Sequence, residues 1–137
     1  MSVREMTQFV TVLDNVPGAL AEITRACAIA GINLEGFFQT IDASQTHGTV
    51  HFVTRNVDEA RTTLVSLGKE FSEKQVLALQ YADKPGVMAH VAQTLGDAGV
   101  NIEEVYVSTP GAAEETVLYV GVSGADLQRA LEIAQQL

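Results

Sequence analysis

The sequence predicts an α+β protein built from two copies of one βαββαβ unit. Three observations support this fold class: an internal repeat, the same order of strand and helix patterns in both halves, and a length of 137 residues, which has room for two very small domains. A shift of 68 positions superposes Pro17-Gly18 on Pro85-Gly86 and Gly31-Ile32-Asn33-Leu34-Glu35 on Gly99-Val100-Asn101-Ile102-Glu103. This period indicates duplication of a complete small fold. We expect one domain over residues 1–74 and a second over 75–137.

The first copy opens with a strand that leads into a helix. Residues 9–13 are a β-rich apolar run, and Pro17 suits the first helical position behind a cap region at Asp14 and Asn15. Gly31 fits a left-handed C-cap. The apolar residues between recur at three and four positions and predict one buried helix face: Leu20, Ile23, Cys27 and Ala30.

Two strands, a helix and a strand follow. The runs 33–41 and 50–54 flank a polar loop at 42–48, which is typical of a hairpin. Asp58 is expected to cap a second helix, which Gly68 ends before an extended segment from Phe71 onward. The inner face of this helix should carry Ala60, Leu64 and Leu67.

The second copy repeats this order without its last strand. Its expected elements are strand 77–81, helix 85–98 with Met88, Val91 and Leu95 inside, strand 101–107, loop 109–115, strand 116–122 and helix 126–136. The segment 71–81 would serve both halves, or the N-terminal residues or another chain would complete the edge. Each unit should form a four-stranded antiparallel sheet with both helices on one face, the ferredoxin-like arrangement. Adjacent apolar residues, such as Phe37 and Phe38, place apolar groups on both sheet faces, so we expect the second face to be covered.

Composition excludes several classes of partner. With 8 Lys and Arg against 17 Asp and Glu, the net charge of -9 would repel phosphate backbones and anionic lipids, so neither nucleic acid nor membrane is expected. No apolar run approaches the ~20 residues of a membrane span, and the first nine residues lack a signal-peptide pattern. We expect a cytoplasmic protein whose single cysteine, Cys27, is a reduced core thiol.

Candidate binding residues lie in the strand-to-helix turns at 14–20 and 83–88. The first turn of a helix leaves backbone N–H groups without partners and carries the positive end of the helix dipole, which favours a carboxylate. Gly18 and Gly86 would let a ligand approach closely. Asn33 and Asn101 follow the far end of each helix, so their participation requires a facing unit. Their amides offer both donors and acceptors, which suits a zwitterion.

The Asn-x-Pro-Gly turn, the apolar helix and Gly-[Ile/Val]-Asn-[Leu/Ile] resemble the ACT domain, a regulatory module of amino-acid biosynthetic enzymes. The Pro-Gly pair, the helix and the Gly-[Ile/Val]-Asn-[Leu/Ile] motif occur twice in register. The resemblance covers residues 8–67 and 77–136 and implies binding of a small free amino acid at domain interfaces. In serine-binding ACT domains the matching residues would be Asn15 and Asn33, whereas Asp83 replaces Asn15 in the second copy and makes the two sites unequal. The candidate ligand-binding residues are Asn15, Val16, Pro17, Gly18, Ala19, Leu20, Asn33, Leu34, Asp83, Lys84, Gly86, Val87, Met88, Asn101 and Ile102.

No constellation for catalysis is visible. His47, His51 and His90 lack metal-ligand spacing, and Ser-His-Asp order, a Walker loop and Rossmann glycines are absent from the sequence. We expect no catalytic residues, no metal, no cofactor and no enzymatic activity. The expected protein is an amino-acid sensor that forms a homodimer. The alternative is a protein-interaction subunit of an amino-acid metabolic enzyme or regulator, with no ligand of its own.

Overall fold

The computed structural model describes residues 1–108 and 115–137, which form two compact units. The first unit is Thr7–Lys74, and the second unit joins Met1–Met6 to Gln75–Leu137. The expected domain boundaries at 1–74 and 75–137 stay a prediction. Among the helices of the described chain, none has the length and hydropathy needed to cross a membrane.

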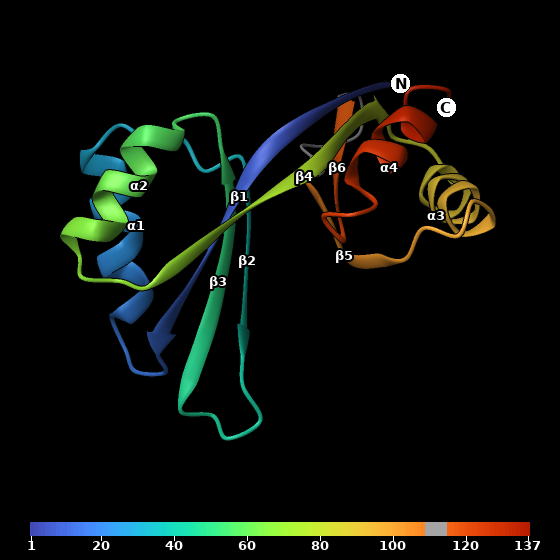
Figure 1. Cartoon of the computed structure of the whole chain (residues 1–137). Coiled ribbons are helices and arrows are strands. Elements are labelled where there is room, and N and C mark those ends of the chain that lie inside the picture. The colour runs from blue at the N-terminus through green and yellow to red at the C-terminus, as the bar shows by residue number, and fades with distance from the viewer. Residues whose placement is uncertain (109–114) are drawn as a thin grey trace. The chain divides into compact units, whose positions relative to one another are not determined.

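The first unit has the predicted βαββαβ order. Its elements are β1 (Ser2–Asp14), α1 (Ala19–Ile29), β2 (Gly36–Ile41), β3 (His47–Thr54), α2 (Val57–Ser66) and the start of β4 (Phe71–Ala82). The strands lie in the order β2-β3-β1-β4, and β3 runs antiparallel to both β1 and β2. Figure 1 shows α1 and α2 side by side on the same face of these strands. The ferredoxin-like α+β fold is confirmed for this unit.

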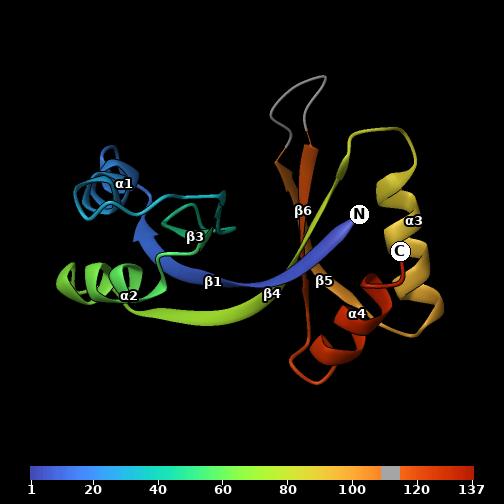
Figure 2. The ribbon, with the colours of Figure 1, turned by 90° about the horizontal axis from the view of Figure 1, so that it is seen from above.

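The second unit repeats the arrangement. After β4 it contains α3 (Val87–Asp97), β5 (Ile102–Ser108), β6 (Glu115–Val122) and α4 (Leu127–Ala134). The strand order is β1-β4-β6-β5, with β6 antiparallel to β4 and β5. In Figure 2, α3 and α4 lie on one face of β4, β5 and β6. The expected loop 109–115 falls mostly outside the described residues, and Glu115 belongs to β6.

The missing fourth strand of the second copy is supplied by the N-terminus. Val3 packs against the core of the second unit, and the Arg4 guanidinium donates a 3.5 Å hydrogen bond to the side chain of Gln80. The segment from Phe71 onward also serves both units, because β4 begins in the first and continues in the second. Phe71 packs against Phe9 in the first unit, with ring centroids 6.0 Å apart. Two of the expected ways to complete the second sheet, the N-terminal residues and a segment shared by both halves, therefore occur together.

Each unit has its own apolar core between sheet and helices. In the first, Phe9 and Phe52 stack with ring centroids 5.3 Å apart, beside the buried Ile23 and Cys27 of α1. In the second, the core includes Leu77, Leu79, Val91, Leu95 and Leu118. Three predicted core residues are wrong: Leu20 is 37% exposed, Met88 is 44% exposed and Ala30 is also exposed. Leu20 and Met88 lie in the first turn of their helices, and Ala30 is the C-cap of α1, so all three are at helix ends.

The helix starts differ from the prediction. Gly18 and Gly86 are the N-caps of α1 and α3, with φ of +89° and +93°, so Pro17 lies in the turn ahead of the helix rather than at its first position. The left-handed backbone redirects the chain at the glycine, which a proline with φ near −65° cannot do.

The residues ahead of α2 and β2 also differ. The N-cap of α2 is Asn56, not Asp58. Asn56 accepts a 3.1 Å hydrogen bond from the Asn33 backbone N–H through its side-chain oxygen. This bond holds Asn33 outside the strand ladder, which begins at Gly36 rather than at residue 33.

Candidate functional site

The loop from β1 to α1 is anchored by Asn15 to the hairpin between β2 and β3. The Asn15 side-chain amide donates a 2.7 Å hydrogen bond to the carbonyl oxygen of Gln45, and its backbone N–H donates to Thr46 at 3.0 Å. The following loop residues, Val16 to Gly18, are exposed. The Asn15 side-chain amide thus donates a hydrogen bond within the unit and holds the loop against the hairpin.

The hairpin brings carboxylates and an imidazole to this loop. Asp42 Oδ1 accepts backbone hydrogen bonds from Thr46 at 3.1 Å and His47 at 3.3 Å. The His47 ring lies between two carboxylates, 3.8 Å from Asp42 and 3.7 Å from Asp14. Partial desolvation raises the pKa of Asp42, but the hydrogen bonds from His47, Ser44 and Thr46 outweigh it and the pKa is lowered. The surroundings of this loop are therefore acidic.

The N-terminus of α1 offers two unpaired donors. The Ala19 N–H already bonds to the Val16 carbonyl at 3.3 Å, and the Glu22 N–H bonds to Gly18 at 3.1 Å. Within the described chain, the N–H groups of Leu20 and Ala21 make no backbone hydrogen bond. Such groups attract an anion, but the neighbouring Asp14 and Asp42 carboxylates oppose one.

The second loop borders a cavity. A hollow of about 350 Å³ lies at the N-terminus of α3, and it is lined by Met1, Lys84, Pro85, Gly86, Val87 and His90. Three of these residues, Lys84, Gly86 and Val87, were predicted from the sequence. A volume of this size is at the lower end of the range for ligand pockets and would hold roughly ten waters at ~30 Å³ each. A small ligand fits it best.

The donors around this cavity suit a carboxylate. The backbone N–H groups of Val87, Met88 and Ala89 have no backbone acceptor among the described residues. They add to the positive end of the α3 dipole. Lys84 contributes a cationic side chain, so an anion at this point meets both charge and hydrogen-bond donors.

Asp83 stands apart from the cavity lining. Its carboxylate acts on Tyr81, where burial and then the negative charge of Asp83 raise the pKa of the phenol. The side chain that distinguishes the second copy from the first in sequence is thus not the group that faces the cavity. Lys84, the next residue, has that role.

The remaining predicted residues lie at the opposite ends of the helices. Asn33 follows the 11-residue helix α1, whose length of about 16 Å at 1.5 Å per residue separates it from Asn15. Leu34 packs against the core of the first unit and Ile102 against that of the second. Asn101 directly precedes β5 and is exposed. Within a unit, the structure does not bring the two asparagines together.

Sequence reasoning missed residues in both loops. His90 lines the cavity because it lies one helical turn beyond Gly86, to which its N–H bonds at 2.9 Å. The i, i+4 spacing in the first turn was the available signal. Gln45, Thr46 and His47 reach the first loop through the antiparallel pairing of Asp14 with His47, which depends on a register that the sequence does not display.

Comparisons with known proteins assign the chain to a family. The ACT domain family matches residues 7–65 and 75–137. A search of curated proteins finds no match. A crystal structure of a protein from Bacteroides thetaiotaomicron is similar with a TM-score of 0.85 and 22% identity, covering 98% of this chain and 89% of that one.

Two further crystal structures are regulatory subunits of aspartate kinase. The one from Thermus thermophilus, in a ligand-free form, has a TM-score of 0.71, and the one from Thermus flavus has 0.66. Each is 18% identical to this chain, and each match covers 99% of this chain and 96% of the other. At these identities the structural similarity establishes the fold, and the family match establishes membership. The chain belongs to the ACT domain family and carries two ACT domains in tandem.

Proposed function

We propose that this protein is a non-catalytic regulatory sensor that binds a small free amino acid, with the carboxylate held in the cavity at the N-terminus of α3. The observation that supports this most strongly is the cavity lined by Lys84, Gly86, Val87 and His90 beside three unpaired backbone donors. Membership of a family of regulatory modules supports the amino-acid class of ligand. The homodimer and the cytoplasmic location remain predictions.

The two loops should differ in affinity for a carboxylate. The cavity of the second unit combines Lys84 with three unpaired donors, whereas the loop of the first unit has two donors and faces Asp14 and Asp42. Nearby like charges disfavour an anion. We therefore propose one strong site per chain, in the second unit, with the ligand ammonium left for a group beyond the cavity lining.

Binding would act by shifting a population of arrangements. A ligand that binds one arrangement of the protein better than another stabilises it by the difference in affinity. Such a change would transmit the amino-acid concentration to a partner enzyme or regulator. A non-catalytic module requires this coupling between ligand binding and the state of its partner.

The test is a thermal-shift panel of the twenty amino acids at millimolar concentration on the full chain. A ligand at ten times its Kd stabilises the folded state by about 1.4 kcal/mol, which raises the Tm by several degrees. Lys84→Met should abolish the shift, whereas Lys69→Met, which removes the same charge away from the cavity, should keep it.

The other outcomes are also decisive. A shift that survives Lys84→Met but is lost in Asn15→Ala would move the site to the first loop, against this proposal. Silence across the whole panel would leave the protein-interaction alternative. Isothermal titration calorimetry on any hit gives the number of sites per chain, which we expect to be one.

A further inference from the structure

The internal repeat permits a residue-by-residue comparison of the two helix pairs. The shift of 68 positions aligns Ala30, the C-cap of α1, with Ala98, the C-cap of α3. The N-caps of α2 and α4 are Asn56 and Asp126. Three residues beyond these N-caps stand Glu59 in the first unit and Arg129 in the second.

Arg129 occupies the C-terminal end of α3. Its Nη2 donates a hydrogen bond to the Ala98 carbonyl oxygen. A Cβ built on Gly99 would lie 4.0 Å from the same nitrogen. The last carbonyl groups of a helix lack intrahelical donors and carry the negative end of the dipole, so a guanidinium is a favourable partner there.

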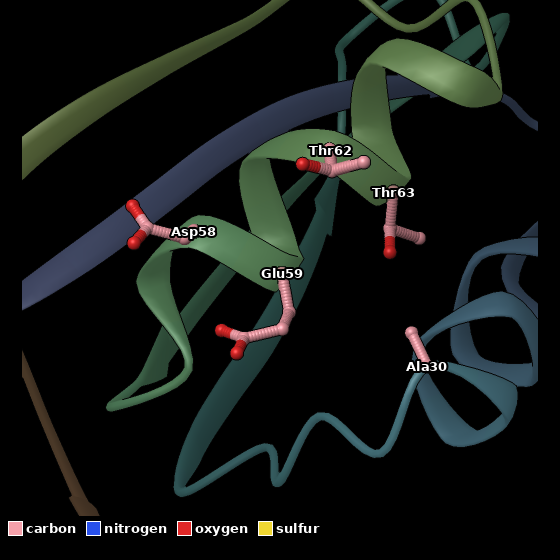
Figure 3. A pocket seen from close by; sticks show the side chains of 5 residues that line it. All are labelled: Ala30, Asp58, Glu59, Thr62 and Thr63. Carbon is pink, nitrogen blue, oxygen red and sulfur yellow. The ribbon is translucent and has the colours of Figure 1, made fainter.

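The first unit leaves this position open. Among the described residues, none donates a hydrogen bond to the Ala30 carbonyl oxygen, and a Cβ on Gly31 would meet nothing within 4 Å. A cavity of about 290 Å³ lies here, lined by Ala30, Asp58, Glu59, Thr62 and Thr63 (Figure 3). Figure 3 shows Glu59 and Thr63 projecting from α2 on the side where Ala30 ends α1.

The charge at this cavity is unbalanced. Asp58 is paired with Arg61 at 3.1 Å, and Arg61 is also held by Glu73. Glu59 has no ion-pair partner within the described part of the chain, and it stands near the negative end of α1, where an anion is unfavourable. A cation from outside would satisfy both the Glu59 carboxylate and the Ala30 carbonyl.

An apolar groove continues from this acidic end. A second cavity of about 290 Å³ shares Ala30, Thr62 and Thr63 with the first and extends between α1 and α2 to Ile29 and Leu67. Ile29, which lines this second cavity, is 82% exposed. Its large aliphatic side chain is therefore available for contact with a partner along the groove.

We propose that the groove between α1 and α2 is a docking surface for an α-helix of a partner protein that carries an arginine. The arginine would bind the Ala30 carbonyl and Glu59, as Arg129 binds Ala98 within the second unit. Arginine suits this position better than lysine because its planar fork bonds a carbonyl and a carboxylate together. An apolar residue one turn along the partner helix would lie on Ile29. This surface is on different elements from the amino-acid cavity and does not depend on it.

The probe is a fluorescent helical peptide with one arginine and a leucine four residues later, titrated with the full chain by fluorescence anisotropy. The control peptide carries citrulline, which keeps the shape and removes the charge. We expect the arginine peptide to bind at least about tenfold tighter, a difference of about 1.4 kcal/mol. Glu59→Gln should weaken binding of the arginine peptide by about fivefold to tenfold. Glu132→Gln, the same change at an exposed residue of α4, should leave it unchanged.

A second variant reverses the charge at Glu59. Glu59→Arg should abolish peptide binding, because its own guanidinium would occupy the Ala30 carbonyl as Arg129 occupies Ala98. Amide NMR signals of Ala30, Gly31 and Thr63 should shift with the arginine peptide. The proposal is overturned if both peptides bind equally, if neither binds, or if Glu59→Gln has no effect on binding. It is also overturned if free arginine binds as tightly as the peptide, or if calcium chloride displaces the peptide at equimolar concentration.

Discussion

Asn15 and Gln45 are joined by a 2.7 Å hydrogen bond from the side-chain amide of the first to the carbonyl oxygen of the second, across thirty positions of sequence. This contact ties the loop ahead of α1 to the hairpin between β2 and β3. Asn33, the other asparagine that the family resemblance implicates, uses its backbone N–H to bond Asn56. The two asparagines therefore differ in what they contribute to the unliganded fold.

Replacement of these asparagines should separate the two roles. Asn15→Ala removes the bond to Gln45 and should lower the free energy of unfolding by about 0.5–1 kcal/mol. Asn33→Ala keeps the backbone bond to Asn56 and should change stability by less than about 0.5 kcal/mol. Urea denaturation measures both. Equal losses in the two variants would show that the Asn15 side chain does not anchor the loop.

The positive φ of Gly18 predicts a cost for any side chain there. Because a Cβ would meet no atom within 4 Å, Gly18→Ala tests backbone strain alone and should destabilise by about 1–2 kcal/mol. Gly96→Ala is the matched control, since Gly96 lies inside α3 with equal free space and no positive φ. It should stabilise by about 0.5–1 kcal/mol. Thermal unfolding that moves both variants in the same direction would contradict this assignment.

The ion pair of Arg61 and Glu73 should contribute to the loss of folding stability at acid pH. Two hydrogen bonds of 2.7 and 2.8 Å from the Arg61 guanidinium lower the pKa of Glu73. A lowered pKa means stability that is present above the ordinary glutamate value of about 4.3 and is lost as pH falls through the folded value. Glu73→Gln should therefore flatten the loss of stability between about pH 5 and pH 3.

A double-mutant cycle isolates this pair from other carboxylates. In an Arg61→Gln background, Glu73→Gln should have little further effect on the acid limb, because the partner that lowers the pKa is gone. Chemical denaturation at a series of pH values supplies the data. An undiminished effect of Glu73→Gln in that background would assign the acid sensitivity elsewhere.

Cys27 should behave as an inert core thiol. It is 1% exposed, and burial raises its pKa. The native protein should react with Ellman's reagent roughly 100-fold or more slowly than the urea-unfolded chain, since reaction requires opening of the core. The raised pKa also predicts that stability falls as pH rises above the ordinary thiol value of about 8.5. Cys27→Ala should remove this alkaline component, and fast native labelling would contradict the burial.

Much of the fold could be predicted from the sequence because its signals are local. The repeat, the helix stripe at Ile23 and Cys27, and the left-handed glycines at Gly31 and Gly68 each depend on spacing or on one residue's conformational freedom. The candidate site was partly predictable for the same reason. Lys84, Gly86 and Val87 line a cavity that the strand-to-helix motif located.

Helix boundaries were less predictable because several residues near each helix start are suited to the N-cap position. Pro17 and Asp58 are both suited to a helix start by propensity, yet Gly18 and Asn56 are the caps. The left-handed backbone at Gly18 and the bond from Asn33 to Asn56 decide these positions. Propensity is a weak prior where such tertiary contacts act.

The sequence by itself determined that this protein has two ferredoxin-like units and where their helix N-termini would offer donors, because periodicity and glycine conformation are local properties. Only the tertiary structure decided that residues 1–6 complete the second sheet. It also decided that Arg129 bonds the C-terminal end of α3, whereas Glu59, at the corresponding position of the first unit, leaves the C-terminal end of α1 open. These outcomes depend on strand pairing and on side chains that approach from a second helix. Residues distant in sequence make both contacts, so neither contact can be predicted from a local sequence pattern.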